Sequence, residues 1–158
     1  MDQPRLTAGA RPVDLEQVTD ELAIRRLVDT FCDGVNSRDS GLWGSVWDDE
    51  GATFCLGGIE RTGKDIIVAG FVDGIEAYEL LVQVAPNGLV EIDGDTATGR
   101  WYILEIGQLR SGSSSQQVAL CHDEYRRTAG GWRLRRREVE RIYKGDAALE
   151  GWVRPVTD

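Results

Sequence analysis

The feature that most constrains this chain is a predicted β-hairpin near its C-terminal end. The segment DEYRRTAGGWRL runs from Asp123 to Leu134, and apolar and polar residues alternate on both sides of Gly130-Gly131. Alternation with a period of two is typical of strands that bury one face, and glycines supply the positive φ that primed hairpin turns need. Because an isolated hairpin is only marginally stable, this segment must belong to a larger antiparallel sheet.

Length and charge exclude several classes of protein. A chain of 158 residues is long enough for one domain with a buried core. Its net charge of −9 argues against a nucleic-acid partner, which requires a basic surface. No apolar run approaches the about 18 residues of a membrane span, so we expect no membrane partner.

The cysteines and the single histidine indicate which cellular compartment to expect and whether to expect a cofactor. The N-terminal residues lack the apolar stretch of a secretion signal, and the three cysteines are widely spaced without a Cys-x-x-Cys pair. We therefore expect reduced thiols in a cytoplasmic protein. With a single histidine and no cluster of ligands, we expect neither a metal nor another cofactor.

Helices are predicted in the first half of the chain and long strands in the second. Asp14 with Gln17, and Thr62 with Asp65, are spaced as capping boxes. Apolar residues at helical spacing then predict helices over residues 14–37, 40–47 and 62–71. Alternation and glycine turns predict strands over residues 52–56, 59–61, 80–92, 96–109, 116–128 and 132–143.

Helices followed by a run of strands indicate an α+β fold, with the helices packed on one face of a mostly antiparallel sheet. We expect a flexible N-terminal tail over residues 1–13, one cavity domain over 14–144 and a C-terminal tail over 145–158. In that tail, Trp152 either folds back over an opening or marks a contact between subunits.

Several short motifs, taken in order, resemble the SnoaL-like branch of the nuclear-transport-factor-2-like fold. They are LAIRRL from Leu22, SRD from Ser37, WDDEGA from Trp47, DEYRR from Asp123 and GWRL from Gly131. The resemblance runs from roughly residue 15 to residue 143. It implies a cone-shaped domain whose strongly curved, mostly antiparallel sheet wraps around a long N-terminal helix and two shorter helices and encloses one apolar cavity. It also implies a homodimer.

The resemblance also indicates what chemistry is missing. Scytalone dehydratase and hexachlorocyclohexane dehydrochlorinase, on this fold, use an aspartate near the end of the first helix and a histidine beyond the third as a general-base dyad. The resemblance puts Asn36 at the aspartate position and Gln83 at the histidine position. Amides do not accept a proton at neutral pH. Elimination by the usual dyad is therefore not expected, and Asn36 and Gln83 are left to orient a substrate.

Glu105 is the first candidate for catalysis. Strand alternation places it on the same face as Trp101 and Ile103. A carboxylate on an apolar face is costly to ionise, and the raised pKa that results suits general acid/base work near neutral pH. The alternative is a carboxylate at the rim of the cavity, paired with arginine.

Arg137 and Asp33 are further candidates. The resemblance points Arg137 into the cavity, where it would bind an oxyanion or a leaving group; alternatively it belongs to a solvated run of arginines over residues 133–137. Asp33 lies one helical turn before Asn36, so it either replaces the missing aspartate or lies on a solvated helix surface.

His122 is the only histidine, and its face of the sheet is the open question. It alternates with Cys121 and Asp123, and the resemblance turns the Cys121 face toward the cavity. A β-bulge would reverse this and bring His122 inward. Cys121 is expected to line the cavity rather than to act as a nucleophile. Large apolar side chains fill the core, and some would line the cavity and select a flat ligand: Phe31, Trp47, Phe71, Tyr78, Trp101 and Tyr125.

Two functions follow from these observations, and a third is weaker. The first is a small cofactor-independent cyclase, isomerase or dehydratase that acts on an apolar cyclic or polyketide-derived compound of secondary metabolism. The second is a non-catalytic protein of the same fold that binds small molecules or supports an oxygenase. The third is epoxide opening as in limonene epoxide hydrolase, for which Arg100 and Glu105 have the wrong spacing.

Overall fold

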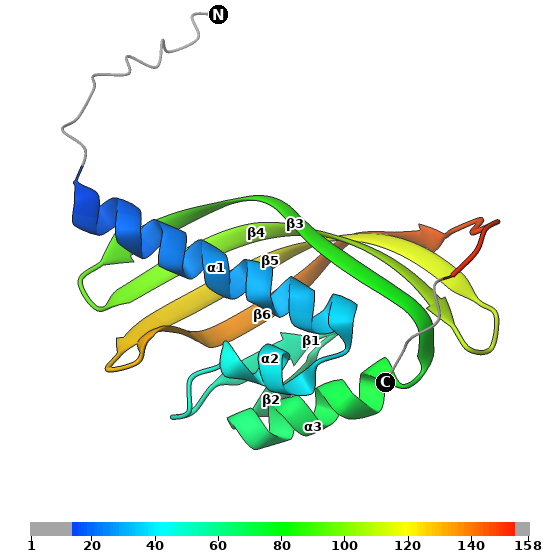
Figure 1. Cartoon of the computed structure of the whole chain (residues 1–158), viewed down its shortest axis with the longest axis horizontal. Coiled ribbons are helices and arrows are strands. Elements are labelled where there is room, and N and C mark those ends of the chain that lie inside the picture. Colours follow the sequence, from blue (N-terminus) through cyan, green and yellow to red (C-terminus); the bar gives the residue numbers. More distant parts are fainter. Residues whose placement is uncertain (1–13, 154–158) are drawn as a thin grey trace, which may run out of the picture.

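The computed structural model describes residues 14–153, and three helices in it lie against one face of a curved sheet (Figure 1). The helices are α1 (Leu15–Ser37), α2 (Ser40–Ser45) and α3 (Lys64–Ile75). The strands are β1 (Thr53–Leu56), β2 (Ile59–Thr62), β3 (Tyr78–Asp93), β4 (Thr96–Leu109), β5 (Ser114–Thr128) and β6 (Gly131–Asp146). The α+β class is confirmed. The tail predicted over residues 1–13 lies outside the described residues.

The six strands form one sheet in the order β2-β1-β6-β5-β4-β3. All neighbours are antiparallel except β1 and β6, which run parallel. The pairing of β3 with β4 and of β5 with β6 shifts register at two places each. Such irregularities bend and twist a strand, so the sheet curves around α1 without closing. The predicted cone-shaped arrangement is thereby confirmed.

The caps of the helices agree only in part with the prediction. The Asp14 carboxylate accepts hydrogen bonds from the amides of Glu16 and Gln17 at 3.0 and 3.5 Å. The side chain of Gln17, however, donates to Glu21 rather than returning to Asp14. The box predicted at Thr62 is wrong, because Gly63 precedes α3 at a φ of 97° and no side chain caps that helix.

Arg38 explains why the SRD motif ends the first helix. It adopts a left-handed conformation with a φ of 58°, which stops α1. Its guanidinium then donates to the backbone carbonyls of Ile75, Tyr78 and Glu79 at 3.0, 2.8 and 3.0 Å. One side chain therefore fixes the end of α1 against the end of α3 and the start of β3.

An aromatic cluster forms the core between the helices and β1. Its members are Phe31, Trp43, Trp47, Phe54 and Phe71, and the rings of Trp43 and Phe71 stack at 4.4 Å. The helices α1 and α2 approach closely here, since a Cβ added to Gly34 would lie 2.7 Å from the Cβ of Trp43. These contacts set one wall of the cavity.

The predicted closing hairpin is present as β5 and β6. Only Gly131 of the two glycines has a positive φ, 94°, so the turn is not of the primed type. This is the pattern of a hairpin whose turn is followed by a glycine bulge. Next to the turn, Asp20 of α1 accepts hydrogen bonds from Arg127 at 2.8 and 2.6 Å and from Trp132 at 2.9 Å. The hairpin is thus anchored to the first helix.

The last part of the described chain extends further as a strand than predicted. β6 continues to Asp146, which pairs with Ser115, whereas the strand was expected to end at Tyr143. Trp152 is 80% exposed and does not line the cavity described below. In the part of the chain that the structure describes, no helix is both long and apolar enough to cross a membrane.

Candidate functional site

A cavity of about 310 Å³ lies between the helices and the concave side of the sheet. Its walls are mostly apolar and include Phe31, Trp43, Phe54, Phe71, Ile103 and Val139. Polar side chains enter it from the long strands: Tyr78, Gln83, Glu105, Gln117, Arg137, Arg141 and Lys144. A cavity of this size with a few converging polar groups is typical of a small-molecule site.

Glu105 projects into this cavity between two amides. Its carboxylate accepts a hydrogen bond from Gln83 Nε2 at 2.5 Å and another from Gln117 Nε2 at 2.5 Å. The three residues are register partners across β3, β4 and β5, so their side chains emerge from one row of the sheet. Burial raises the pKa of Glu105 above its ordinary value, although both amides and the nearby cations act against this rise.

The predicted face of Glu105 is therefore the observed one, and its partners are amides rather than arginine. Gln117 was not identified from the sequence. The loop between β4 and β5 contained a signal for it: positions 105 and 117 are equally distant from residue 111, so a hairpin centred on residue 111 pairs Glu105 with Gln117. This pairing can be predicted only when the length and geometry of the loop are known.

Arg137 is the second charged group of the cavity, and only 1% of it is exposed. Its Nε and Nη2 donate to the Asp123 carboxylate at 2.8 and 2.6 Å. The guanidinium carbon lies 4.2 Å from the centre of the Phe31 ring. Burial by itself would lower the pKa of Arg137, but the Asp123 carboxylate outweighs it and holds the pKa well above its ordinary range. The guanidinium is therefore a permanent buried cation.

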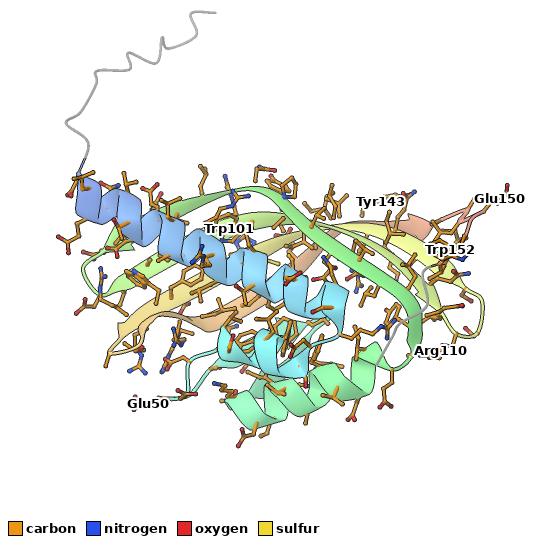
Figure 2. The ribbon with its side chains drawn as sticks, viewed as in Figure 1. Glu50, Trp101, Arg110, Tyr143, Glu150 and Trp152 are labelled. Atoms are coloured by element: carbon orange, nitrogen blue, oxygen red, sulfur yellow. The ribbon has the colours of Figure 1, made fainter. Side chains whose placement is uncertain are left out.

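Asp123 is itself held by a chain of hydrogen bonds. The Tyr125 hydroxyl donates to Asp123 at 2.5 Å and accepts from Trp101 Nε1 at 2.9 Å. Figure 2 labels Trp101 where it lies beneath α1, and the Arg25 guanidinium packs over its ring at 5.2 Å. Tyr125 and Trp101 thus lie behind the cavity wall and fix the orientation of Arg137 through Asp123.

Three buried polar atoms of cavity-lining side chains lack a partner among the described residues. They are Arg137 Nη1 and Trp43 Nε1, both donors, and Gln83 Oε1, an acceptor. Buried polar groups are nearly always satisfied, so each is a candidate contact for a bound molecule. Together with Glu105 they offer a proton-transfer group, a cationic donor and an acceptor at one site.

Cys121 also lines the cavity, as predicted. Burial raises the pKa of its thiol to about 12, more than the nearby Arg137 lowers it. The thiol therefore stays protonated at neutral pH and is a poor nucleophile. Of the remaining apolar residues expected to select a ligand, Phe31, Phe71 and Tyr78 line the cavity. Trp47, Trp101 and Tyr125 are buried but do not line it, because they pack in the core behind it.

Asn36 lies outside the cavity, contrary to the substrate contact predicted for it. Its amide donates to the carbonyl of Gln83 at 2.8 Å and accepts from the Gln83 backbone N–H at 2.7 Å. Gln83 lies on β3, an edge strand whose backbone groups have no strand partner on that side. Asn36 supplies the missing partner and joins α1 to the edge of the sheet.

Asp33 and His122 also lie away from the cavity. Asp33 is exposed on α1, in a shallow surface groove next to Asn36. The His122 side chain is 51% exposed and contacts Glu140 at 3.0 Å on the opposite face of the sheet. The pairing of β4 with β5 has no bulge, so strand alternation keeps His122 on the outer face while Cys121 and Asp123 point inward.

The chain is similar to a known family in sequence and to solved proteins in structure. A family model described as the SnoaL-like domain matches residues 16–138. No curated protein matches the sequence. Within residues 14–153, no group of three or more histidine, cysteine, aspartate or glutamate side chains is arranged to hold a metal ion.

Several solved structures share the fold. A hexachlorocyclohexane dehydrochlorinase, LinA-type3 from Novosphingobium barchaimii LL02, superposes with a TM-score of 0.78 at 24% identity, over 90% of this chain and 100% of that one. A candidate scytalone dehydratase from Novosphingobium aromaticivorans DSM 12444 gives a TM-score of 0.76 at 14% identity, over 85% and 91%. A candidate aromatic ring hydroxylase from Novosphingobium aromaticivorans gives 0.76 at 24% identity, over 82% and 94%. At these identities the likeness establishes the fold and leaves the chemistry to the residues of the site.

Proposed function

Because this chain belongs to the SnoaL-like family, we propose that it is a small cofactor-independent enzyme that moves a proton on an apolar cyclic molecule by general acid/base catalysis. The observation that carries the proposal is Glu105, a half-buried carboxyl group that lines the cavity and is held there by two amides. A raised pKa brings such a group closer to neutral pH, where it can both accept and return a proton.

Glu105 would remove a proton from a carbon next to a carbonyl group. The electron pair of the broken C–H bond moves onto the carbonyl oxygen and forms an enolate. Arg137 Nη1, a buried cationic donor without a partner within residues 14–153, would stabilise that oxygen. Gln83 and Gln117 would hold the carboxyl group in one orientation throughout.

The fate of the enolate decides the overall reaction. Return of the proton from Glu105 to another carbon gives an isomerisation. Attack of the enolate carbon on a second carbonyl gives a cyclisation once the new alkoxide takes the proton from Glu105, and departure of a β-hydroxyl group with that proton, as water, gives a dehydration. The small cavity with aromatic walls suits a ligand of one or two rings, which favours a cyclic or polyketide-derived compound of secondary metabolism. We further propose that the protein acts in the cytoplasm.

A second candidate is a protein that binds such a molecule, or supports an oxygenase, without chemistry of its own. The two amides Asn36 and Gln83, in place of a general-base dyad, favour it. In addition, the side chain of Asn36 is hydrogen-bonded to the backbone of β3. Binding without proton exchange would distinguish this candidate from the enzyme.

Proton removal can be measured without knowing the natural substrate. With 2-tetralone in D₂O, the protein should accelerate exchange of the hydrogens next to the carbonyl, as followed by proton NMR. Glu105→Gln should lower the catalysed rate by about 10²-fold or more. This variant should fold, because Gln83 Oε1 has no partner among the described residues and its amide can turn to accept from the new side chain.

Glu140→Gln is the matched control, since Glu140 lies on the outer face beside His122. Like Glu105→Gln, this substitution replaces one carboxylate by an amide. The variant should keep the wild-type rate. Unchanged exchange in Glu105→Gln would remove Glu105 from the mechanism. Saturable binding of the ketone by the wild type, with no exchange at all, would favour the non-catalytic candidate.

A further inference from the structure

The side chains that line the cavity carry charge of the opposite sign to that of the whole chain. Four of them are basic, Arg61, Arg137, Arg141 and Lys144, and one is acidic, Glu105. The chain as a whole has a net charge of −9. An excess of cations at one cavity of an acidic protein favours entry of an anion through its local field.

Three of these cations have no carboxylate in direct contact in the described part of the chain. Arg137 is paired with Asp123. Within residues 14–153, no ion pair includes Arg61, Arg141 or Lys144. By contrast, Arg126 and Arg127 on β5 and Arg135 and Arg136 on β6 all contact carboxylates.

Arg141 and Lys144 lie where the cavity meets solvent. Both are exposed residues of β6 that nevertheless line the cavity. Arg141 Nε donates to Gln117 Oε1 at 3.1 Å, and Gln117 in turn donates to Glu105. Lys144 is the register partner of Gln117. Two cations therefore lie beside the row of side chains that contains Glu105.

We propose that the substrate carries an anionic group, such as a carboxylate, which binds Lys144 and Arg141 at the mouth while its ring enters the apolar cavity, with Arg61 adding to the field from β2. This inference rests on the proposed function and names the class of substrate for it. An apolar ligand alone would cover these cations without a partner, which costs free energy. A carboxylate would replace the water lost from them with charge-assisted hydrogen bonds.

Binding of an anion to Lys144 and Arg141 would also change the pKa of Glu105. Lys144 and Arg141 both lower the pKa of Glu105 in the free protein, against the larger effect of burial. An anion bound to them cancels that influence, so the pKa of Glu105 rises further when the substrate is in place. A carboxylate with a higher pKa is a stronger base, and binding would therefore activate the group that removes the proton.

The test compares two bicyclic ligands that differ in charge, 2-naphthoate and 2-naphthamide, by isothermal titration calorimetry. The wild type should bind the naphthoate about tenfold more tightly at low salt, and the preference should shrink between about 0.05 and about 0.5 M salt. Lys144→Met should weaken naphthoate binding roughly two- to fivefold and leave naphthamide binding unchanged.

Arg26→Gln is the control, since Arg26 is exposed on α1 and does not line the cavity. Like Lys144→Met, this substitution removes one positive charge. The variant should bind both ligands as the wild type does. Equal affinities for the two ligands in the wild type, or equal losses in Lys144→Met and Arg26→Gln, would overturn the proposal. Circular dichroism verifies that each variant is folded.

The result of this binding experiment does not depend on whether the protein catalyses proton exchange. If the wild type prefers naphthoate and 2-tetralone shows no catalysed exchange, the anionic subsite stands and the enzymatic proposal fails. If exchange is catalysed and the two naphthalene ligands bind equally, the enzyme stands and its substrate is neutral.

Discussion

Among single residues, two of the charged groups that line the cavity, Glu105 and Arg137, differ in how a partner offsets their burial. Glu105 has amide partners, which stabilise its ionised form less than a full countercharge would, and its pKa is raised. Arg137 has the Asp123 carboxylate, and its pKa stays high. The same cavity therefore holds one group that can change protonation state and one that cannot. General acid/base catalysis with a fixed cationic donor requires this combination.

The raised pKa of Glu105 predicts how stability varies with pH. The folded protein binds this proton more tightly than the unfolded chain, so the contribution is fully present below the ordinary pKa of 4.5 and is lost as pH rises through the higher folded value. Glu105→Gln has no such proton, and its free energy of unfolding should fall less than that of the wild type above pH 4.5. Urea denaturation at several pH values measures the difference. Parallel curves for the two proteins would contradict the raised pKa.

Between elements, the structure depends on a few close contacts rather than on helix propensity. Gly34 lets α1 approach α2 so closely that the backbone of Trp43 lies within 2.8 Å of where a Cβ would be. Alanine is better than glycine within a helix by up to about 1 kcal/mol. Overpacking against a backbone that cannot move costs about 1–3 kcal/mol, so the contact should outweigh the propensity.

We therefore predict that Gly34→Ala lowers the free energy of unfolding by up to about 2 kcal/mol, the overpacking cost of about 1–3 kcal/mol less the helix-propensity gain of about 1 kcal/mol. Gly74→Ala in α3 is the matched control, because nothing lies within 4 Å of a Cβ placed there. It should raise stability by up to about 1 kcal/mol. Thermal and chemical denaturation of both variants measure the two signs. Stabilisation by Gly34→Ala would show that α1 and α2 can separate without cost.

On the scale of the whole molecule, the outer face of the sheet carries apolar residues that no helix covers. Val82, Val84, Leu104 and Ile106 form two directly opposed pairs across β3 and β4, and each is 40–47% exposed. Tyr102 continues the row along β4. A contiguous apolar patch of this kind is unusual on a monomer. We propose that it is the contact between two copies of this chain in a homodimer.

Leu104→Glu should weaken that dimer, because it places an unpaired charge at the centre of the patch. An increase in the dissociation constant of about 30-fold or more is expected. Leu22→Glu is the control, since Leu22 is 65% exposed on α1, away from the sheet. Light scattering coupled to size-exclusion chromatography measures the mass of each protein. A monomeric wild type, or equal dissociation of the two variants, would contradict the proposal.

The order of the elements and the faces of the strands could be predicted from the amino-acid pattern alone. Helix and strand periods are local properties, so the long first helix, the six strands and the closing hairpin could be predicted from the spacing of apolar residues. Strand alternation likewise placed Glu105 on the face of Ile103, and Cys121 opposite His122. The resemblance to a known family then supplied the curvature of the sheet and the presence of a cavity.

Which side chains meet depends on the tertiary structure. Glu105 lies between Gln83 and Gln117 because β3, β4 and β5 pair in one particular register, and the bulges in the pairing of β3 with β4 are not encoded in a two-residue period. Asn36 turns to the edge of β3 instead of the cavity because the edge strand offers unpaired backbone groups, which depends on how α1 docks. Periodicity fixes a side chain's direction within its own element, whereas its neighbours depend on the positions of elements that are distant in the chain.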